Sequence, residues 1–472
     1  MGLPFAEFLQ TYCGSVKDIP IAKIAKVERN PDRSKHLETA KATVLGIELD
    51  FVNLRSEEYA EDSRIPTQIA FGTPLQDALR RDITINALFY NVHSRSVEDL
   101  TEKGLQDLKD GIIRTPLSPK ETFMDDPLRI VRCIRFSSRF GFTMVPELQA
   151  AAKDGEIQHA LRTKISRERI GEELDKMMKG RDPLLAIKLI SELGLYSSIF
   201  YIPPAVAKSF SAPVGPASSA LAAACVLHTL THRDVSRRPT LPPLHPVLSA
   251  AAFHEPSTLP RLYLACALTP YRSITYEDAK QKPRSGVEGA IREGTKLGVQ
   301  NHYLDGVTAL FEAADILKNP TTGGDNERAR MGKINPLKSV HASNKGAFWA
   351  TSMLFSLVQE LVPFWHVDRE DIDVEEATKR IEAYNAFITR AEALDLLATA
   401  HAKALLDGND IVRVLETSQR GPWTGEVLER VVEWQLANPE RTKEQCEQWL
   451  REERTAGRIV IAQPTQAKKS RN

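Results

Sequence analysis

The sequence predicts an α+β protein in which a mixed sheet comes first and a mainly α-helical region follows. Residues 41–55, KATVLGIELDFVNLR, alternate apolar and polar side chains about Gly46, as the two strands of a hairpin do. Residues 83–91, ITINALFYN, predict a second β run. From residue 126 to 195, apolar residues recur every three or four positions, which is the spacing of helices. We therefore expect the change from sheet to helix near residue 120.

The composition favours a multidomain protein that does not span a membrane. The chain has 472 residues, of which 42% are hydrophobic and 26% charged, enough for several units of about 100–200 residues each. It contains no apolar run of about 18 residues, and its start lacks the basic flank and apolar core of a secretory signal. The five cysteines form no Cys-x-x-Cys pair, so neither a disulfide framework nor a zinc knuckle is expected. We expect an intracellular protein without a membrane partner.

Three Pro-rich or polar stretches interrupt the helical region, and we expect them to be loops or linkers. They are residues 202–216, 237–260 and 318–336. The expected organisation is a head over 1–120, a helical neck over 121–200, a helical body with Pro-rich loops over 201–345, a helical tail over 346–450 and a disordered basic tail over 451–472.

A row of arginines follows the start of the first predicted neck helix. Asp126 can cap this helix, and the proline after it suits the first turn. The arginines, spaced three, three and four positions apart, are Arg129, Arg132, Arg135 and Arg139. This spacing places them on one side of the helix, where like charges repel unless anions or acidic residues meet them. A triphosphate is one candidate, and the carboxylates of Glu168 or Glu172 are the alternative.

Asp126 and Arg129, one helical turn apart, suit one particular hydrogen-bonding edge. A carboxylate accepts hydrogen bonds and a guanidinium donates them. Cytosine and adenine each offer an amino donor beside a ring-nitrogen acceptor, whereas uracil and guanine offer the opposite polarity. The pair therefore predicts selection of CTP and ATP without a nucleic-acid template, although any helix start with Asp and Arg at this spacing has the same chemistry.

Four motifs follow one another along the first part of the chain. They are LRRDITINALFYN (79–91), GLQDLKDGIIRTPLSP (104–119), FMDDPLRIVRCIRFSSRFGF (123–142) and ISRERIGEELDKMM (165–178). Two further segments are LLDGNDI (405–411) and GPWTGEVLERVVEWQLANP (421–439). In these motifs the chain resembles the CCA-adding tRNA nucleotidyltransferases, and most of all the eukaryotic branch of their bacterial-type class.

The resemblance implies a fold, a reaction, partners and compartments. The head would hold an incomplete nucleotidyltransferase-like mixed sheet, and the helical tail would bind tRNA. The reaction would add CMP, CMP and AMP from CTP and ATP to the acceptor end of tRNA, with Mg²⁺ as cofactor. Members of this family serve the cytoplasm, the nucleus and the mitochondrion.

The resemblance also implies a nucleotide-binding site. Its residues would be Arg81, Asp82, Asn86, Asp126, Arg129, Arg132 and Arg135. Arg81 would contact the sugar-phosphate part of the nucleotide, in a pocket shaped by Asp82 and Asn86. Arg132 and Arg135 would hold the ligand and its phosphates, because a planar guanidinium donates well to phosphoryl oxygens. Asp126 and Arg129 would contact the base.

The metal ligands that the resemblance implies are not assigned. The family holds two Mg²⁺ ions on an Asp-x-Asp pair that follows a Gly-Gly and Arg-Asp segment, upstream of the region where this chain begins. Asp371-Ile372-Asp373 has the Asp-x-Asp spacing but lacks the glycines and the flanking strands. Asp50, on a predicted strand, remains as a candidate third carboxylate. The catalytic residues are therefore unknown. A sheet that lacks its first strands leaves an edge unpaired, so an exposed sheet edge is expected near residues 46–52.

The sequence consequently leaves three functions open. The first is CCA addition, with catalysis in doubt because the Asp-x-Asp motif is absent. The second is a non-catalytic RNA-binding protein derived from such an enzyme. The third is a relative that, like a poly(A) polymerase, adds adenylate only.

Overall fold

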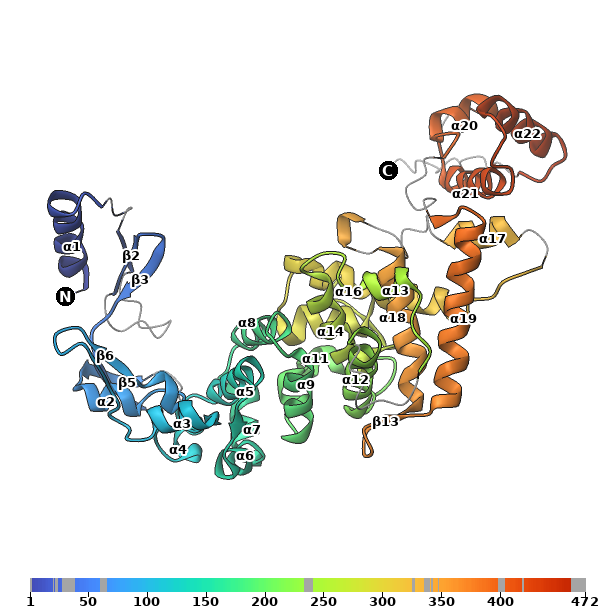
Figure 1. The fold of residues 1–472 in the computed structure, drawn as a ribbon. Coiled ribbons are helices and arrows are strands. Elements are labelled where there is room, and N and C mark those ends of the chain that lie inside the picture. Colours follow the sequence, from blue (N-terminus) through green and yellow to red (C-terminus); the bar gives the residue numbers. More distant parts are fainter. Residues whose placement is uncertain are drawn as a thin grey trace, which may run out of the picture. The chain divides into compact units, whose positions relative to one another are not determined.

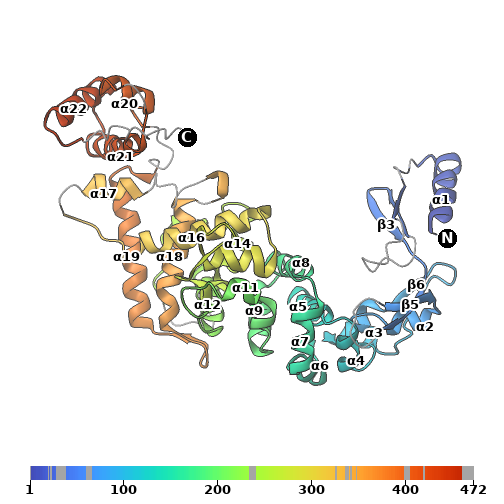
Figure 2. The same ribbon diagram turned by 180° about the vertical axis from the view of Figure 1, so that it is seen from behind.

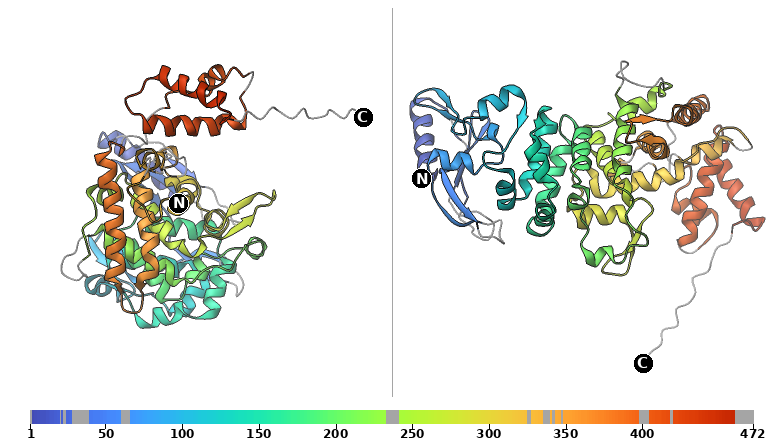
Figure 3. Two further views of the ribbon diagram at one scale, coloured as in Figure 1. Left: turned by 90° about the vertical axis from the view of Figure 1, so that its right-hand side faces the viewer. Right: turned by 90° about the horizontal axis from the view of Figure 1, so that it is seen from below.

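The computed structural model describes most of the chain, which forms two compact units (Figures 1, 2 and 3). The described residues are 2–19, 21, 24–27, 39–59, 66–232, 241–324, 327–334, 340, 343–346, 348–397, 404–417 and 420–459. The N-terminal unit comprises Met1–Ser209 with Gly289–Leu297, and the C-terminal unit comprises Phe210–Glu288 with Gly298–Asn472. Most of the described strands lie in the N-terminal unit, and the C-terminal unit is mainly helical. The predicted α+β class is confirmed.

The predicted hairpin about Gly46 is present. β2 (Thr39–Val44) pairs antiparallel with β3 (Ile47–Phe51), and β1 (Ala25–Val27) pairs with the other side of β2. Leu45 and Gly46 form the turn with φ angles of 52° and 78°. Two-residue hairpin turns need positive φ angles, which glycine adopts at little cost.

Helix α1 (Gly2–Val16) covers this sheet and leaves apolar surface exposed. α1 buries Ala6 and Cys13 and contacts both β2 and β3. The exposed apolar residues here are Phe5, Phe8, Tyr12, Val16, Ile47 and Leu49. β3 is an outer strand of the three-stranded sheet. The exposed edge expected near residues 46–52 is therefore confirmed within the described part of the chain.

A second hairpin leads into helix α2. β4 (Arg55–Tyr59) pairs with β5 (Pro66–Phe71), and α2 (Pro74–Leu79) follows. Thr73 caps α2, since its hydroxyl accepts the amide of the third helical residue. A Cβ on Gly72 would lie only 2.5 Å from the carbonyl carbon of the first residue of β4, so this close approach requires glycine.

The β run predicted at residues 83–91 is wrong in its first half. Thr84–Asn86 form the 3-10 helix η2, and the strand β6 comprises only Phe89–Asn91, paired with β7 (Ser96–Glu98). The hydroxyl of the first residue of η2 donates to the buried carboxylate of Asp107 (2.7 Å). Contacts with distant parts of the chain thus hold this segment in a turn despite its β-forming residues.

The helices predicted from residue 126 to 195 are present, as α5 (Leu128–Phe140), α6 (Pro146–Ala152), α7 (Gly155–Lys164), α8 (Arg167–Met178) and α9 (Pro183–Glu192). The N-terminal unit also contains α3 (Gly104–Asp110), α4 (Pro119–Asp125), α10 (Tyr196–Ile199) and α11 (Pro204–Ala207). The short parallel strands β8 (Ile112–Ile113) and β9 (Thr143–Met144) pair beside them. α5 packs against α8 and α9, and two arginines of its row, Arg132 and Arg135, meet Glu173 of α8.

Gly171 lets helix α8 approach a π-helical turn, η4 (Ala290–Thr295), of the same unit. A Cβ built on Gly171 would lie 2.0 Å from the carbonyl oxygen of Thr295. Arg167 strengthens this contact, because its guanidinium donates to the carbonyls of Gly294, Ser198 and Ile199. The backbone of η4 therefore cannot yield cheaply to a side chain at position 171.

Gly171→Ala is expected to lower the free energy of unfolding by about 1–3 kcal/mol, because the added methyl overlaps a backbone carbonyl. Gly425→Ala is the matched control: it lies inside the helix Pro422–Ala437, and nothing lies within 4 Å of its Cβ position. Alanine should stabilise that helix by up to about 1 kcal/mol. Chemical denaturation of both variants measures these changes. An equal change in the free energy of unfolding in the two variants would contradict the close contact of Gly171 with the carbonyl of Thr295.

The C-terminal unit is built mainly from helices. They are α12 (Ser218–Thr231), α13 (Pro246–Ala251), α14 (Thr258–Ala267), η3 (Thr269–Tyr271), α15 (Gly286–Gly289), η5 (Gln300–His302), α16 (Tyr303–Leu317), α17 (Glu327–Ile334), η6 (Ser343–Lys345), α18 (Trp349–Leu361), η7 (Val362–Phe364), α19 (Val374–Ala393), α20 (Gly408–Val414), α21 (Pro422–Ala437) and α22 (Lys443–Thr455). Two hairpins, β10 (Thr275–Glu277) with β11 (Pro283–Ser285) and β12 (Trp365–His366) with β13 (Asp371–Ile372), complete it. Helices α14, α16 and α18 pack together in its centre.

The three stretches predicted as loops or linkers contain helices. α11 lies in 202–216, α13 and the start of α14 lie in 237–260, and α17 lies in 318–336. In each of α11 and α13 a proline occupies the first turn, where its missing amide costs no helical hydrogen bond. Proline therefore begins these helices, whereas the sequence interpretation took it as a sign of a loop.

Helices α20, α21 and α22 share one apolar core. It contains Trp423, Val431, Cys446 and Leu450. α22 extends to Thr455, past the expected boundary at residue 450, because Glu453 near its end is buried and pairs with Arg430 and Arg458. The expected disordered tail is thus wrong for residues 451–455, and residues 460–472 lie outside the described residues.

Asp410 provides a test of this helical region at acid pH. Lys443 donates a 2.7 Å hydrogen bond to it and, with Arg413, lowers the pKa of Asp410 from 3.8 to about 2, although partial burial acts in the opposite direction. Its stabilising contribution is therefore complete above about pH 4 and lost as the pH falls through about 2. The melting temperature of wild type should exceed that of Asp410→Asn at pH 5, and the gap should shrink at pH 2. A melting-temperature difference that is the same at pH 5 and pH 2 would contradict a stabilising role of the ionised Asp410 carboxylate.

Within the described ranges, no helix is both long enough and apolar enough to cross a bilayer.

Candidate nucleotide-binding site

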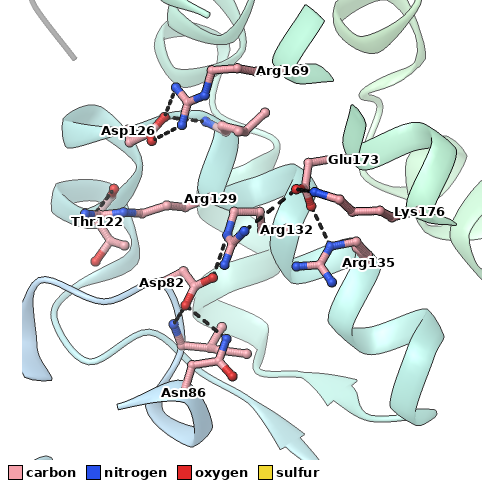
Figure 4. A network of polar contacts seen from close by, with 12 residues as sticks. Asp82, Asn86, Thr122, Asp126, Arg129, Arg132, Arg135, Arg169, Glu173 and Lys176 are labelled. Atoms are coloured by element: carbon pink, nitrogen blue, oxygen red, sulfur yellow. Dashed lines mark hydrogen bonds and ion pairs between the residues drawn. The ribbon is translucent and has the colours of Figure 1, made fainter. Parts of the chain in front are cut away.

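Residues from four segments of the N-terminal unit lie close together and form polar contacts (Figure 4). The turn after α2 supplies Asp82 and Asn86, the junction of α4 and α5 supplies Asp126, and α8 supplies Arg169 and Glu173. Helix α5 supplies Arg129, Arg132 and Arg135, whereas Arg139 is exposed. Hydrogen bonds and ion pairs link side chains that are 38 to 50 positions apart in the sequence. The packing of α5 against α8 thus brings Arg132 and Arg135 to Glu173, whereas Arg81 contacts Asp77 of α2.

Asp82 joins two of the predicted residues. Its Oδ2 accepts a 2.7 Å hydrogen bond from Nε of Arg132, and its Oδ1 accepts bonds from Nδ2 of Asn86 (3.3 Å) and the amide of Ile83 (3.0 Å). Asp82 is buried, whereas the Arg132 side chain is 34% exposed. The carboxylate therefore fixes the Nε of an arginine whose side chain is still about one-third exposed.

Glu173 is the carboxylate that meets Arg132 and Arg135, two members of the row of arginines. It is buried and pairs with Arg135, with Arg132 (3.7 Å) and with Nζ of Lys176 (3.0 Å). Burial acts to lower the pKa of Arg132, but the nearby carboxylates of Asp82 and Glu173 outweigh it and raise the pKa. Arg132 therefore stays charged in this partly dry setting.

Glu168 and Glu172, the carboxylates considered from the sequence, lie on the exposed side of α8 and do not take this place. Glu173 instead belongs to the buried stripe of the helix.

Arg129 is buried, and its guanidinium binds backbone carbonyls. Nη1 donates to the carbonyl of Thr122 (3.1 Å) and Nη2 to that of Arg80 (2.7 Å). Asp125 lies 3.9 Å from Nη1. Arg129 therefore fastens the turn after α2 to helices α4 and α5.

Asp126 pairs with Arg169, a residue that the sequence interpretation did not assign to the site. Nη2 of Arg169 donates to Oδ2 at 2.7 Å and Nη1 to Oδ1 at 3.4 Å. Asp126 lies between α4 and α5, and its Oδ1 also accepts the amide of Leu128 (3.2 Å). The expected cap is therefore wrong: Pro127 is the N-cap residue of α5, with no side-chain cap hydrogen bond, and Asp126 lies one residue before it. The pair is 19% and 32% exposed, so its polar atoms are partly accessible.

Arg81 is hydrogen-bonded to Asp77, a buried carboxylate of α2. Nε and Nη2 of Arg81 donate to Oδ2 of Asp77 at 3.2 and 2.7 Å. The guanidinium also lies 5.8 Å from the centroid of the Phe89 ring. Burial acts to raise the pKa of Asp77, but hydrogen bonds from Arg81 and Arg80 outweigh it, so the pKa lies below its usual value. Asp77 is therefore ionised at neutral pH.

The described residues do not assemble a carboxylate set that fits Mg²⁺. Asp50 is 61% exposed and pairs with Lys41 at 3.1 Å. Asp371 pairs with Arg369, and Asp373 caps helix α19. Among the described residues no group of three or more His, Cys, Asp or Glu side chains is placed to hold a metal ion.

A sequence signal for Glu173 existed in the pattern of α8. Ile170, Leu174 and Met177 mark the buried stripe at helical spacing, and position 173 falls inside it. A charged residue in such a stripe needs a partner of opposite charge. The arginines of α5 were the available partners, so the pairing could have been inferred.

Comparison with known proteins bears on both the head and the neck. The family of poly(A) polymerase head domains matches residues 10–114. The family described as "probable RNA and SrmB-binding site of polymerase A" matches residues 141–209. Together with the polar network, these matches define the class: the chain carries a nucleotidyltransferase head domain followed by a helical neck.

The full-length relatives are more specific. The mitochondrial CCA tRNA nucleotidyltransferase of Saccharomyces cerevisiae is 33% identical over 449 residues, which covers 93% of this chain and 80% of that protein. The tRNA nucleotidyltransferase cca1 of Schizosaccharomyces pombe is 34% identical over 94% of this chain and 84% of that protein. The chain belongs to the CCA tRNA nucleotidyltransferase family.

Solved structures agree on the fold. The CCA-adding enzyme of Bacillus stearothermophilus in complex with CTP matches with a TM-score of 0.53 and 18% identity, over 89% of this chain and 83% of that one. A CCA-adding enzyme in complex with ATP matches with a TM-score of 0.55 and 18% identity, over 98% of this chain and 84% of that one. At this identity the likeness establishes the fold alone.

Proposed function

We propose that this chain binds CTP and ATP and adds CMP, CMP and AMP to the acceptor end of tRNA. The observation that carries the proposal is the set of contacts that fix Asp82 against Arg132 of α5 and Asp126 against Arg169 of α8. It combines a carboxylate acceptor with several fixed guanidinium donors. Relatives named as CCA tRNA nucleotidyltransferases, and structures of similar fold with CTP or ATP, support it.

Base selection is assigned to Asp126 and Arg129. The amino group of cytosine or adenine would donate to Asp126, and the ring nitrogen beside it would accept from Arg129 in place of a backbone carbonyl. Uracil and guanine would set an oxygen against the carboxylate, which repels it. Arg169 supports this selection, because its two-pronged contact fixes the plane of the Asp126 carboxylate.

Sugar and phosphate binding are assigned to the remaining predicted residues. Arg81 would contact the sugar-phosphate part, in a pocket formed with Asp82 and Asn86. Arg132 and Arg135 would steady the phosphates. Both arginines already lie beside Glu173, so little ordering of their side chains remains to be done when a ligand binds.

The tRNA partner, the metal and the compartment are proposed from the family. The tail helices would contact tRNA, with Mg²⁺ taking part when bound. Two yeast relatives are named as mitochondrial proteins, so the mitochondrion is proposed besides cytoplasm and nucleus.

Incubation of the chain with Mg²⁺, labelled CTP and tRNA that lacks its CCA end tests the proposal. Incorporation of CMP, followed by AMP when ATP is added, is the expected result. Incorporation of AMP alone would favour an adenylate-adding enzyme. Binding of tRNA and CTP without incorporation would favour a non-catalytic derivative, and absence of CTP binding would overturn the site itself.

A further inference from the structure

We propose that Asp77 is a positioning residue that holds Arg81 in the orientation needed to contact the sugar-phosphate part of the nucleotide. The inference rests on the proposed function, because it takes Arg81 as a ligand contact. Asp77 lies one helical turn before Arg81 in the chain, inside α2.

The contacts of Asp77 account for both of its oxygens. Oδ2 accepts Nε and Nη2 of Arg81, so the carboxylate meets one full edge of that guanidinium. Oδ1 accepts Nε of Arg80 at 2.9 Å and the backbone amide of Arg55 at 3.3 Å. A group held on both oxygens cannot rotate freely, so it provides a fixed base for the arginine.

The two partners, Asp77 and Arg81, differ sharply in solvent exposure. Asp77 is 1% exposed, whereas the Arg81 side chain is 37% exposed. The edge of the guanidinium with Nε and Nη2 faces the protein, which leaves its remaining N–H groups at the accessible end. Phe89 lies beside the group and further limits its movement. This is the arrangement that a phosphate-binding arginine requires: fixed on one edge and accessible on the other.

Asp77 also connects Arg81 to the arginine proposed to contact the base. Its partner Arg80 offers its backbone carbonyl to Nη2 of Arg129. Arg80 and Arg81 are adjacent, so the turn that Asp77 stabilises carries contacts to both. Loss of Asp77 is therefore expected to weaken nucleotide binding in addition to any effect on stability.

The test measures CTP affinity of the full chain by titration calorimetry. Asp77→Asn keeps the shape but removes the charge, and we expect it to weaken CTP binding about tenfold, within the range of coupling between contacting residues. Arg81→Ala should weaken binding at least as much. In the double variant the Asp77 change should add nothing, because Arg81 is no longer there to be positioned.

Asp99→Asn is the matched control. Asp99 is a carboxylate of the same head region that accepts the hydroxyl of Thr101 (2.8 Å) and the amide of Leu105 (2.9 Å), without contact to Arg81. Its loss should lower stability and leave CTP affinity unchanged. A purely structural role of Asp77 would make the two variants alike.

The outcomes separate the two proposals. A wild-type chain that does not bind CTP overturns the proposed function. A folded Asp77→Asn variant that binds CTP like wild type overturns only the role of Asp77, as does an additive effect in the double variant. If Asp77→Asn does not fold, Arg81→Lys replaces it: lysine keeps the charge but cannot make the two-pronged contact. Wild-type affinity of Arg81→Lys would then overturn the inference.

Discussion

Asp126→Asn is expected to lose most of its preference for CTP over UTP. The carboxylate only accepts hydrogen bonds, whereas an asparagine amide also donates and can satisfy the O4 oxygen of uracil. It would also lose the charge-assisted contact with Arg169 that fixes its plane. A hydrogen bond to a charged group contributes about 1.5–3 kcal/mol, so the CTP-to-UTP affinity ratio should fall about 10- to 100-fold. Titration of wild type and variant with each nucleotide measures it.

Asp175→Asn is the control for this prediction. Asp175 lies on α8 and pairs with Lys179 of the same helix (2.9 Å), away from Asp126. It should leave both affinities unchanged, because an ion pair at a partly exposed helical position contributes little. If Asp126→Asn retains the wild-type ratio, Asp126 does not read the base edge, even if the chain binds CTP.

The sequence predicted well those features that depend on local patterns. The hairpin about Gly46 follows from alternation and a positive-φ turn, both readable from neighbouring residues. The helices from residue 126 onward follow from spacing in the same way. The β run predicted at residues 83–91 is wrong only in its first half, because a buried acceptor, Asp107, holds Thr84 in a turn, and no local pattern shows such a distant partner.

The predicted site residues lie in one region, yet their pairing could not be derived from the sequence. Helical spacing placed Asp126 and Arg129 as neighbours, but it cannot show that backbone carbonyls take up the guanidinium of Arg129. Nor does it show that Arg169, 43 positions away, meets Asp126. Spacing within one helix determines its faces, whereas pairing depends on which helix packs against that face.

Glu173→Ala is expected to destabilise the N-terminal unit by about 3–5 kcal/mol, the usual effect of removing one partner from a buried ion pair. Glu173 is the shared partner of Arg135, which is itself buried, and of Arg132 and Lys176. Its removal leaves positive charges close together in a region from which water is largely excluded. For a unit of this size the melting temperature should fall by on the order of 10 °C. Thermal unfolding followed by circular dichroism measures the change.

Glu172→Ala separates the charge network from any general effect on helix α8. Glu172 precedes Glu173 in the same helix but is exposed, so its replacement should change stability by no more than about 0.5 kcal/mol. Equal losses in the two variants would show that Glu173 acts through helix formation. A selective loss in Glu173→Ala would show that the arginines of α5 depend on it. Because Arg132 also bonds Asp82, such a variant should bind CTP more weakly even at temperatures where it remains folded.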